Sequence, residues 1–126
     1  RVAGMLKNCG AAGFVTDGPM RDLNGLKKVG FPSWCSGLTP ASPVSKGPGT
    51  VGLNINISGV EVCSGDVIIA DPDGIIAIPL ADLDEITIRC HEILELETEL
   101  DQKVSNGLKV PNEIELLLES ENVQYV

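Results

Sequence analysis

The stretch Gly-Phe-Val-Thr-Asp-Gly-Pro-Met-Arg-Asp at residues 13–22 decides how the chain is interpreted. A short apolar run leads into the turn-forming sequence at residues 17–19, and an Arg21-Asp22 pair follows directly. Turns at strand ends hold functional side chains on a rigid support. Arginine binds anions, and a neighbouring carboxylate is a ligand for hard metal ions. We therefore take Arg21 and Asp22 as the candidate functional pair.

The segments around this stretch alternate between helical and extended patterns. Apolar residues at helical spacing in residues 1–9 predict a helix stopped by Gly10, and residues 12–16 predict a buried strand. After the turn, residues 22–29 predict a short helix that Gly30 closes. The sequence thus predicts a mixed α/β chain with the charged pair between a strand and a helix.

The middle of the chain predicts strands and turns. Residues 31–35 indicate a second strand, and residues 36–52, rich in Gly, Pro, Ser and Thr, indicate an ordered loop or broken strands. Strict apolar alternation in residues 53–57 predicts a strand with one buried face. Residues 67–70 and 75–79 predict a hairpin, because the Asp-Gly between them supplies the torsions of a tight turn.

The C-terminal part is acidic and helical. Residues 81–126 hold twelve of the eighteen acids and three of the nine bases, so the charge of −9 belongs to this segment. Residues 81–104 predict a long helix with one apolar stripe, and residues 111–120 predict a second amphipathic helix before an apolar tail. The stripe either docks onto its own domain or meets a partner subunit, and the pattern leaves both alternatives open.

Length and composition limit the class of protein. We expect a single domain over residues 1–126 that lacks an N-terminal part, because the chain starts at Arg1 without a methionine. Without a long apolar segment, and with no cluster of basic residues, we expect a cytoplasmic protein that binds neither membrane nor nucleic acid. The cysteines lack a C-x-x-C motif, and we expect reduced, mostly buried thiols.

Several motifs together resemble one known family, which joins the regulator of ribonuclease activity A to the 4-hydroxy-4-methyl-2-oxoglutarate (4-carboxy-4-hydroxy-2-oxoadipate) aldolases. The resemblance covers residues 1 to about 105. It is carried by Gly10-x-x-Gly13-x-Val15-x-Asp17-Gly18-x-x-Arg21-Asp22, Gly30-Phe31-Pro32, Gly65-Asp66-Val67-Ile68-x-Ala70-Asp71-x-Asp73-Gly74 and Pro79.

The resemblance implies a fold, an assembly and an activity. The fold is a three-layered β/β/α swivelling domain, here with added C-terminal helices, and the assembly is a homotrimer or hexamer. The activity is that of a lyase that cleaves 4-hydroxy-2-oxo acids to pyruvate and decarboxylates oxaloacetate with Mg²⁺ or Mn²⁺. A hard cation stabilises the enolate charge that develops during such a cleavage.

The resemblance also implies roles for individual residues. Asp22 is the direct metal ligand, and Arg21 holds the carboxylate and oxo group of the substrate. The backbone amides of Arg1 and Val2 face the substrate carboxylate, and an acid that activates a water falls just before Arg1. Glu97, on the long C-terminal helix, is the expected acid from a neighbouring subunit.

Each role has a simpler alternative. Arg21 and Asp22 also fit a surface arginine beside a helix-capping aspartate. Glu97 also fits the solvated face that the other glutamates of its helix form. We read Asp17 as shaping its turn, Asp71 and Asp73 as hairpin residues, and His91 as structural. A non-catalytic protein that binds and regulates an RNA-degrading endonuclease is the alternative function, because fold alone does not fix activity.

Overall fold

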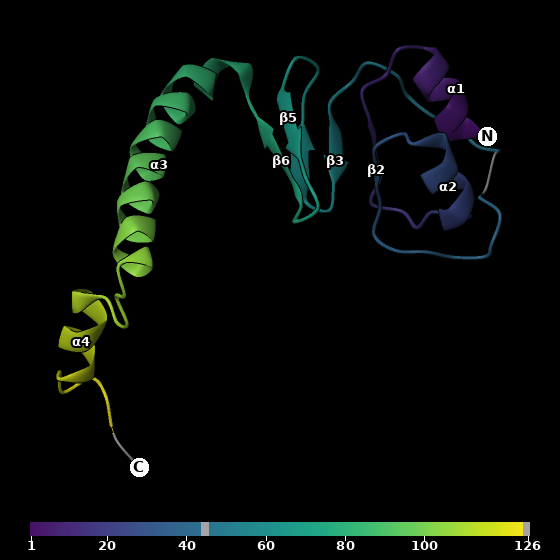
Figure 1. Ribbon diagram of the computed structural model, residues 1–126. Coiled ribbons are helices and arrows are strands. Elements are labelled where there is room, and N and C mark those ends of the chain that lie inside the picture. The colour runs from purple at the N-terminus through teal and green to yellow at the C-terminus, as the bar shows by residue number, and fades with distance from the viewer. Residues whose placement is uncertain (44–45, 125–126) are drawn as a thin grey trace. The chain divides into compact units, whose positions relative to one another are not determined.

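The computed structural model describes residues 1–43 and 46–124. Residues 44–45 of the expected loop and residues 125–126 of the expected apolar tail lie outside the described residues. The chain divides into two compact units, Arg1–Ala77 and Ile78–Val126, and each is described by itself (Figure 1). The expectation of one domain stays a prediction.

The elements follow the order that the sequence predicts. The first unit contains α1 (Val2–Asn8), β1 (Phe14–Val15), α2 (Leu23–Val29), β2 (Ser33–Trp34), β3 (Ile55–Ile57), β4 (Val60–Val62), β5 (Val67–Ala70) and β6 (Ile75–Ile78), whose last residue begins the second unit. The second unit continues with the 3-10 helix η1 (Leu80–Asp82), α3 (Leu83–Ser105) and α4 (Asn112–Leu118).

The two short helices of the first unit end as expected. Gly10 and Gly30 follow α1 and α2 with φ angles of 81° and 60°, the left-handed region that glycine adopts without strain. The helices contact each other, and Lys7 Nζ donates a 2.8 Å hydrogen bond to the carbonyl of Val29. That carbonyl lies at the C-terminal end of α2, where the helix dipole favours a cation.

The strands of the described residues pair as three two-stranded sheets. β1 and β2 are parallel, with Phe14 opposite Ser33 and Val15 opposite Trp34. β3 and β4 form an antiparallel hairpin, and β5 pairs with β6. The Trp34 indole donates a 2.8 Å hydrogen bond to the carbonyl of Asp71 and so joins β2 to the turn that follows β5.

The β5–β6 turn is confirmed, although not for the expected reason. Neither Asp73 nor Gly74 has a positive φ angle. Instead, Asp71 Oδ1 accepts hydrogen bonds from the amides of Asp73 (2.8 Å) and Gly74 (3.0 Å). A side-chain carboxylate therefore closes this turn, as aspartates commonly do.

The second unit consists mainly of the long helix α3. Acidic Asp84 and Glu85 lie in its first turn and Lys103 in its last, which matches the helix dipole. Gly107 follows it with φ 96°, and the amide of Leu108 donates a 2.9 Å hydrogen bond to the Lys103 carbonyl. The helix thus ends at Ser105, within one residue of the expected end.

The buried part of the described structure is small. Its buried apolar residues are Ala3, Phe31 and Ile78, which are 5% to 6% exposed. The expected one-sided burial at residues 53–57 is only partly present, since Ile57 is half-buried while Ile55 is 48% exposed. A two-stranded hairpin has no second layer of its own, and so both its faces meet solvent.

The prediction of mostly buried cysteines is wrong. Cys9 and Cys90 are exposed, and Cys35 and Cys63 are half-buried. All four thiols are free, as expected. Cys9 is the C-cap of α1, and Cys90 lies on α3.

The architecture is therefore mixed α/β, with small sheets and C-terminal helices. The finer expectation, a three-layered swivelling domain, stays a prediction. Among the described helices, none combines the length and the apolarity needed to cross a bilayer.

Phe31 provides the first testable prediction. We expect Phe31→Ala to lower the free energy of unfolding by about 3 kcal/mol, because it removes a buried aromatic ring next to α2. Urea denaturation followed by circular dichroism measures the loss. Leu53→Ala, at a residue 63% exposed, is the control and should cost under about 0.5 kcal/mol. Equal losses of unfolding free energy in the two variants would contradict the prediction that burial of Phe31 stabilises the fold.

Candidate functional site

The Arg21-Asp22 pair lies at the end of a hydrogen-bonded ladder that continues the β1–β2 pairing. Met20 pairs with Leu38 in a parallel bridge. The amide of Met20 donates to the carbonyl of Gly37 (2.9 Å), and the amide of Thr39 donates to the carbonyl of Met20 (2.9 Å). The segment before the pair is thus held along residues 33–39, and α2 starts directly after it.

The turn within this ladder is shaped by Thr16 and not by the expected Asp17. Thr16 Oγ1 accepts a 3.0 Å hydrogen bond from the amide of Gly18. The Asp17 carboxylate is exposed and makes no hydrogen bond to another described residue. A hydroxyl two residues before the amide forms the same kind of turn that an aspartate would.

Asp22 has an unusual backbone conformation. It is the N-cap of α2 with φ 64° and ψ 55°, and its Oδ1 accepts a 3.0 Å hydrogen bond from the amide of Gly25. Left-handed torsions at a residue other than glycine cost energy, and aspartate and asparagine tolerate them best. Such strain is concentrated at functional sites, which is the reason to look beyond capping here.

Gly25 makes room for this carboxylate. A Cβ atom at residue 25 would lie 2.6 Å from Asp22 Cγ and 2.9 Å from Asp22 Oδ1. The carboxylate therefore occupies the space that a side chain would need. This explains why a residue with poor helix propensity stands in the first turn of α2.

Arg21 points to a different neighbour. Its Nη1 donates a 2.8 Å hydrogen bond to the hydroxyl of Ser42 in the loop after β2. Within residues 1–43 and 46–124, Arg21 forms no ion pair with Asp22. The two charges are therefore exposed side by side without neutralising each other, and each can meet a ligand of opposite charge.

An apolar groove of about 350 Å³ lies beside the pair. Met20 and Leu23, which flank Arg21 and Asp22 in sequence, belong to its lining, and Lys27 adds one cation. Leu26, Phe31, Pro32 and Leu38 complete its apolar walls. Sequence reasoning missed this groove and the Ser42 contact, because both depend on the loop after β2 folding back to residue 20.

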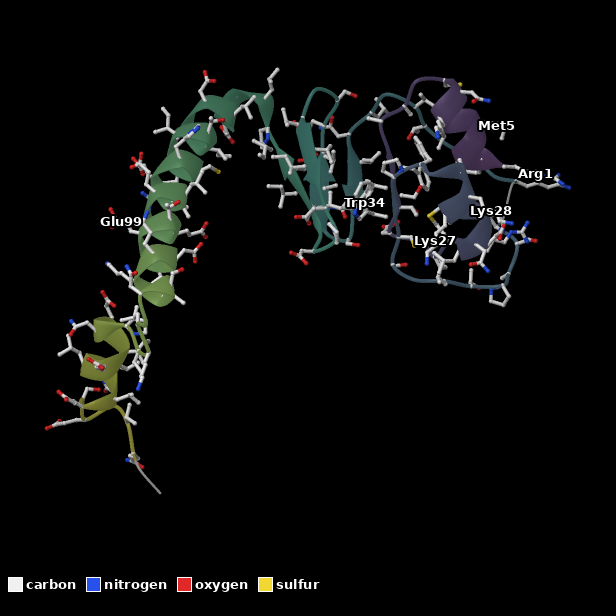
Figure 2. The ribbon with its side chains drawn as sticks, in the orientation of Figure 1. Arg1, Met5, Lys27, Lys28, Trp34 and Glu99 are labelled. Atoms are coloured by element: carbon white, nitrogen blue, oxygen red, sulfur yellow. The ribbon has the colours of Figure 1, made fainter. Side chains whose placement is uncertain are left out.

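Arg1, Val2 and Glu97 are the other expected site residues. Arg1 and Val2 form the start of α1, and Figure 2 shows the Arg1 side chain extending away from the helices. No hydrogen bond or ion pair between described residues links them to Arg21 or Asp22. Glu97 is exposed on α3, in the second unit. The proposed roles of these three residues stay predictions.

Cys63 and His91 are two further titratable residues, and both interact with nearby groups of their own unit. Burial and the nearby Asp66 and Glu61 carboxylates raise the pKa of the Cys63 thiol, which favours its protonated form. His91 Nδ1 lies 2.8 Å from the carbonyl of Thr87, one turn earlier in α3. That contact agrees with the structural role expected for His91.

The comparisons with known proteins define the class. The chain belongs to the RraA-like family, whose model, described as Aldolase/RraA, matches residues 1–77. The matched residues coincide with the first compact unit and include Arg21 and Asp22. The resemblance noted from the sequence motifs is thereby confirmed.

Individual relatives agree with this assignment. A Halalkalibacterium halodurans protein provisionally named as a 4-hydroxy-4-methyl-2-oxoglutarate aldolase is 42% identical over 78 residues, which make up 62% of this chain and 37% of that protein. The 4-hydroxy-4-methyl-2-oxoglutarate aldolase of Thermus thermophilus is 34% identical over 70 residues, 56% of this chain and 43% of that protein.

A solved structure supports the fold. An uncharacterized protein from Pseudomonas syringae pv. tomato matches with a TM-score of 0.76 at 21% identity, over 86% of this chain and 55% of that chain. The present chain thus spans only 37% to 55% of the length of these three proteins.

The double role of Asp22 can be separated by substitution. We expect Asp22→Asn to keep the free energy of unfolding within about 0.5 kcal/mol, because asparagine caps helices and tolerates left-handed torsions. Asp22→Ala should lose about 1 kcal/mol or more through the lost cap. Urea titration of both variants measures the difference. An Asn variant as unstable as the Ala variant would show that the negative charge itself stabilises the fold.

Proposed function

We propose that the protein is a divalent-metal-dependent lyase that cleaves 4-hydroxy-2-oxo acids to pyruvate and decarboxylates oxaloacetate. The observation that supports this most is the strained, exposed Asp22 beside Arg21, whose guanidinium is bound to the neutral Ser42 hydroxyl, at the end of a hydrogen-bonded ladder. Membership of the RraA-like family and the aldolase names of two relatives support the same activity.

The donor atoms of this region fit Mg²⁺ or Mn²⁺. Among the described residues, no three His, Cys, Asp or Glu side chains gather as a metal cage, which disfavours a zinc-type site. Magnesium keeps several waters and needs only one or two carboxylates. Asp22 Oδ1 accepts a hydrogen bond from the Gly25 amide. The carboxylate is exposed, and its remaining lone pairs are available to a cation.

In this proposal each residue has a defined task. When bound, the cation supplies a Lewis acid that stabilises the negative charge developing on the 2-oxo group. Asp22 holds the cation, and Arg21 binds the substrate carboxylate through its planar guanidinium. The apolar groove beside them offers an apolar surface to the carbon chain of the substrate. The amides of Arg1 and Val2 would also face the substrate carboxylate.

Assembly completes the proposal. We expect a homotrimer or hexamer in which Glu97 of one copy approaches the site of the next. The supporting observation is the exposed apolar stripe of α3, where Ile93, Leu94 and Leu100 surround Glu97 and are 43%, 58% and 44% exposed. An exposed apolar stripe of this kind is unusual on a monomer. Once the stripe is buried in a contact, the Glu97 carboxylate needs a polar partner.

The activity is tested by metal-dependent pyruvate release from oxaloacetate and 4-hydroxy-4-methyl-2-oxoglutarate. We expect turnover with Mg²⁺ or Mn²⁺, none after chelation, and a loss of more than about 100-fold in Asp22→Asn, because the proposed metal ligand is removed. Asp73→Asn, the same change at an exposed turn residue, should stay active.

Two results would overturn this proposal. One is turnover that chelators do not affect, and the other is no turnover at any metal concentration in a protein that includes the acid expected just before Arg1. In the second case, capture of an RNA-degrading endonuclease by the purified chain would favour the non-catalytic regulator instead.

The assembly makes a separate prediction. Sedimentation equilibrium should give the mass of a trimer or hexamer, and Leu100→Asp should dissociate it, because a charge would enter the apolar contact. Glu99→Gln, at the neighbouring exposed residue labelled in Figure 2, serves as the control and should leave the mass unchanged. A wild-type monomer at every concentration would refute the assembly.

A further inference from the structure

The loop after β2 is held in a conformation that returns it to Arg21. The ladder between residues 14–20 and 33–39 ends at Thr39, whose amide donates to the Met20 carbonyl. Thr39 Oγ1 then accepts a 3.2 Å hydrogen bond from the amide of Ala41. A hydroxyl bonded to the amide two residues later forms a tight turn. This turn places the next residue, Ser42, beside the end of the ladder.

Ser42 is the described residue to which the guanidinium of Arg21 is bound. Its Oγ accepts the 2.8 Å hydrogen bond from Arg21 Nη1. Pro40 and Pro43 stand on either side of the segment that carries it, and each proline restricts the backbone. The hydroxyl is thus presented from a backbone with few alternative conformations.

We propose that Ser42 is a positioning residue for Arg21. This inference rests on the proposed function, in which Arg21 binds the carboxylate of a 2-oxo acid. An exposed arginine has many rotamers, and a fixed partner on one Nη reduces the freedom that substrate binding must remove. The hydroxyl occupies one of five N–H donors, so the rest of the guanidinium stays available for a carboxylate.

Substitution of Ser42 should change substrate binding more than the chemical step. We expect Ser42→Ala to raise the KM for oxaloacetate, measured with Mg²⁺, by about fivefold, while kcat changes by less than about twofold, because one neutral-acceptor hydrogen bond is lost. Ser42→Thr, which keeps the hydroxyl, should restore most of the affinity.

Ser36→Ala is the matched control. Ser36 lies in the same loop, and its hydroxyl makes no hydrogen bond to another described residue. We expect wild-type KM and kcat in this variant. Thermal unfolding of all three variants should match the wild type, since Ser42 is exposed and its contact is local.

A second measurement does not depend on turnover. Phenylglyoxal reacts with free guanidinium groups, and mass spectrometry of the peptide that contains Arg21 gives its rate of modification. We expect phenylglyoxal to modify Arg21 faster in Ser42→Ala than in the wild type. The rate in Ser36→Ala should equal that of the wild type.

The outcomes separate this inference from the proposed function. Unchanged KM and unchanged Arg21 reactivity in Ser42→Ala would overturn the positioning role while the lyase stands. A parallel loss of kcat and thermal stability would also overturn it and assign Ser42 to the fold. If the wild type releases no pyruvate, the lyase proposal fails, and the Arg21 reactivity alone decides whether Ser42 anchors the guanidinium.

Discussion

The parallel ladder between residues 14–20 and 33–39 is the constraint on which the candidate site depends. Its last links, from Met20 to Gly37 and Thr39, fix where the chain leaves extended structure and enters α2. Arg21 and Asp22 stand at this junction. Without the ladder, the backbone around Arg21 and Asp22 would be free to move. Their adjacency in sequence would then not fix the relative positions of the two side chains.

The Asp22 carboxylate caps α2, and this role is compatible with the proposed binding of a metal ion. Its bond from the Gly25 amide satisfies a helix donor that would otherwise lack an intrahelical partner. The same bond fixes the orientation of the carboxylate, and a fixed ligand needs less reorganisation when a cation binds. The capping and metal-ligand alternatives for Asp22 are therefore compatible, and the residue keeps its left-handed torsions in either case.

Local patterns predicted most of the helices and strands. The helices near residues 1–9, 22–29 and 81–104, and the glycines that end them, follow from periodicity and capping chemistry. The strands are shorter than expected, since β1 and β2 have two residues each. The alternating pattern at residues 53–57 identified a strand but not its burial, because burial depends on a covering layer that a single strand cannot specify.

The candidate site was predictable only in part. Arg21 and Asp22 were found because a family motif and a turn signal coincide at them. Ser42 was not found, since no local rule links a serine in a proline-rich loop to an arginine 21 residues earlier. The Thr16 turn was missed because aspartate is the commoner residue for that task.

The exposed apolar surface is the physical argument for the proposed assembly. Ile55 and Val60 of the β3–β4 hairpin are 48% and 54% exposed, and a two-stranded hairpin without cover is marginally stable in water. The α3 stripe leaves further apolar area in contact with solvent. Burial of such surfaces favours association by roughly 25 cal/mol for each Å² removed from water. Since Glu97 stands within the stripe, the contact that buries these side chains would also bring an acid to another copy.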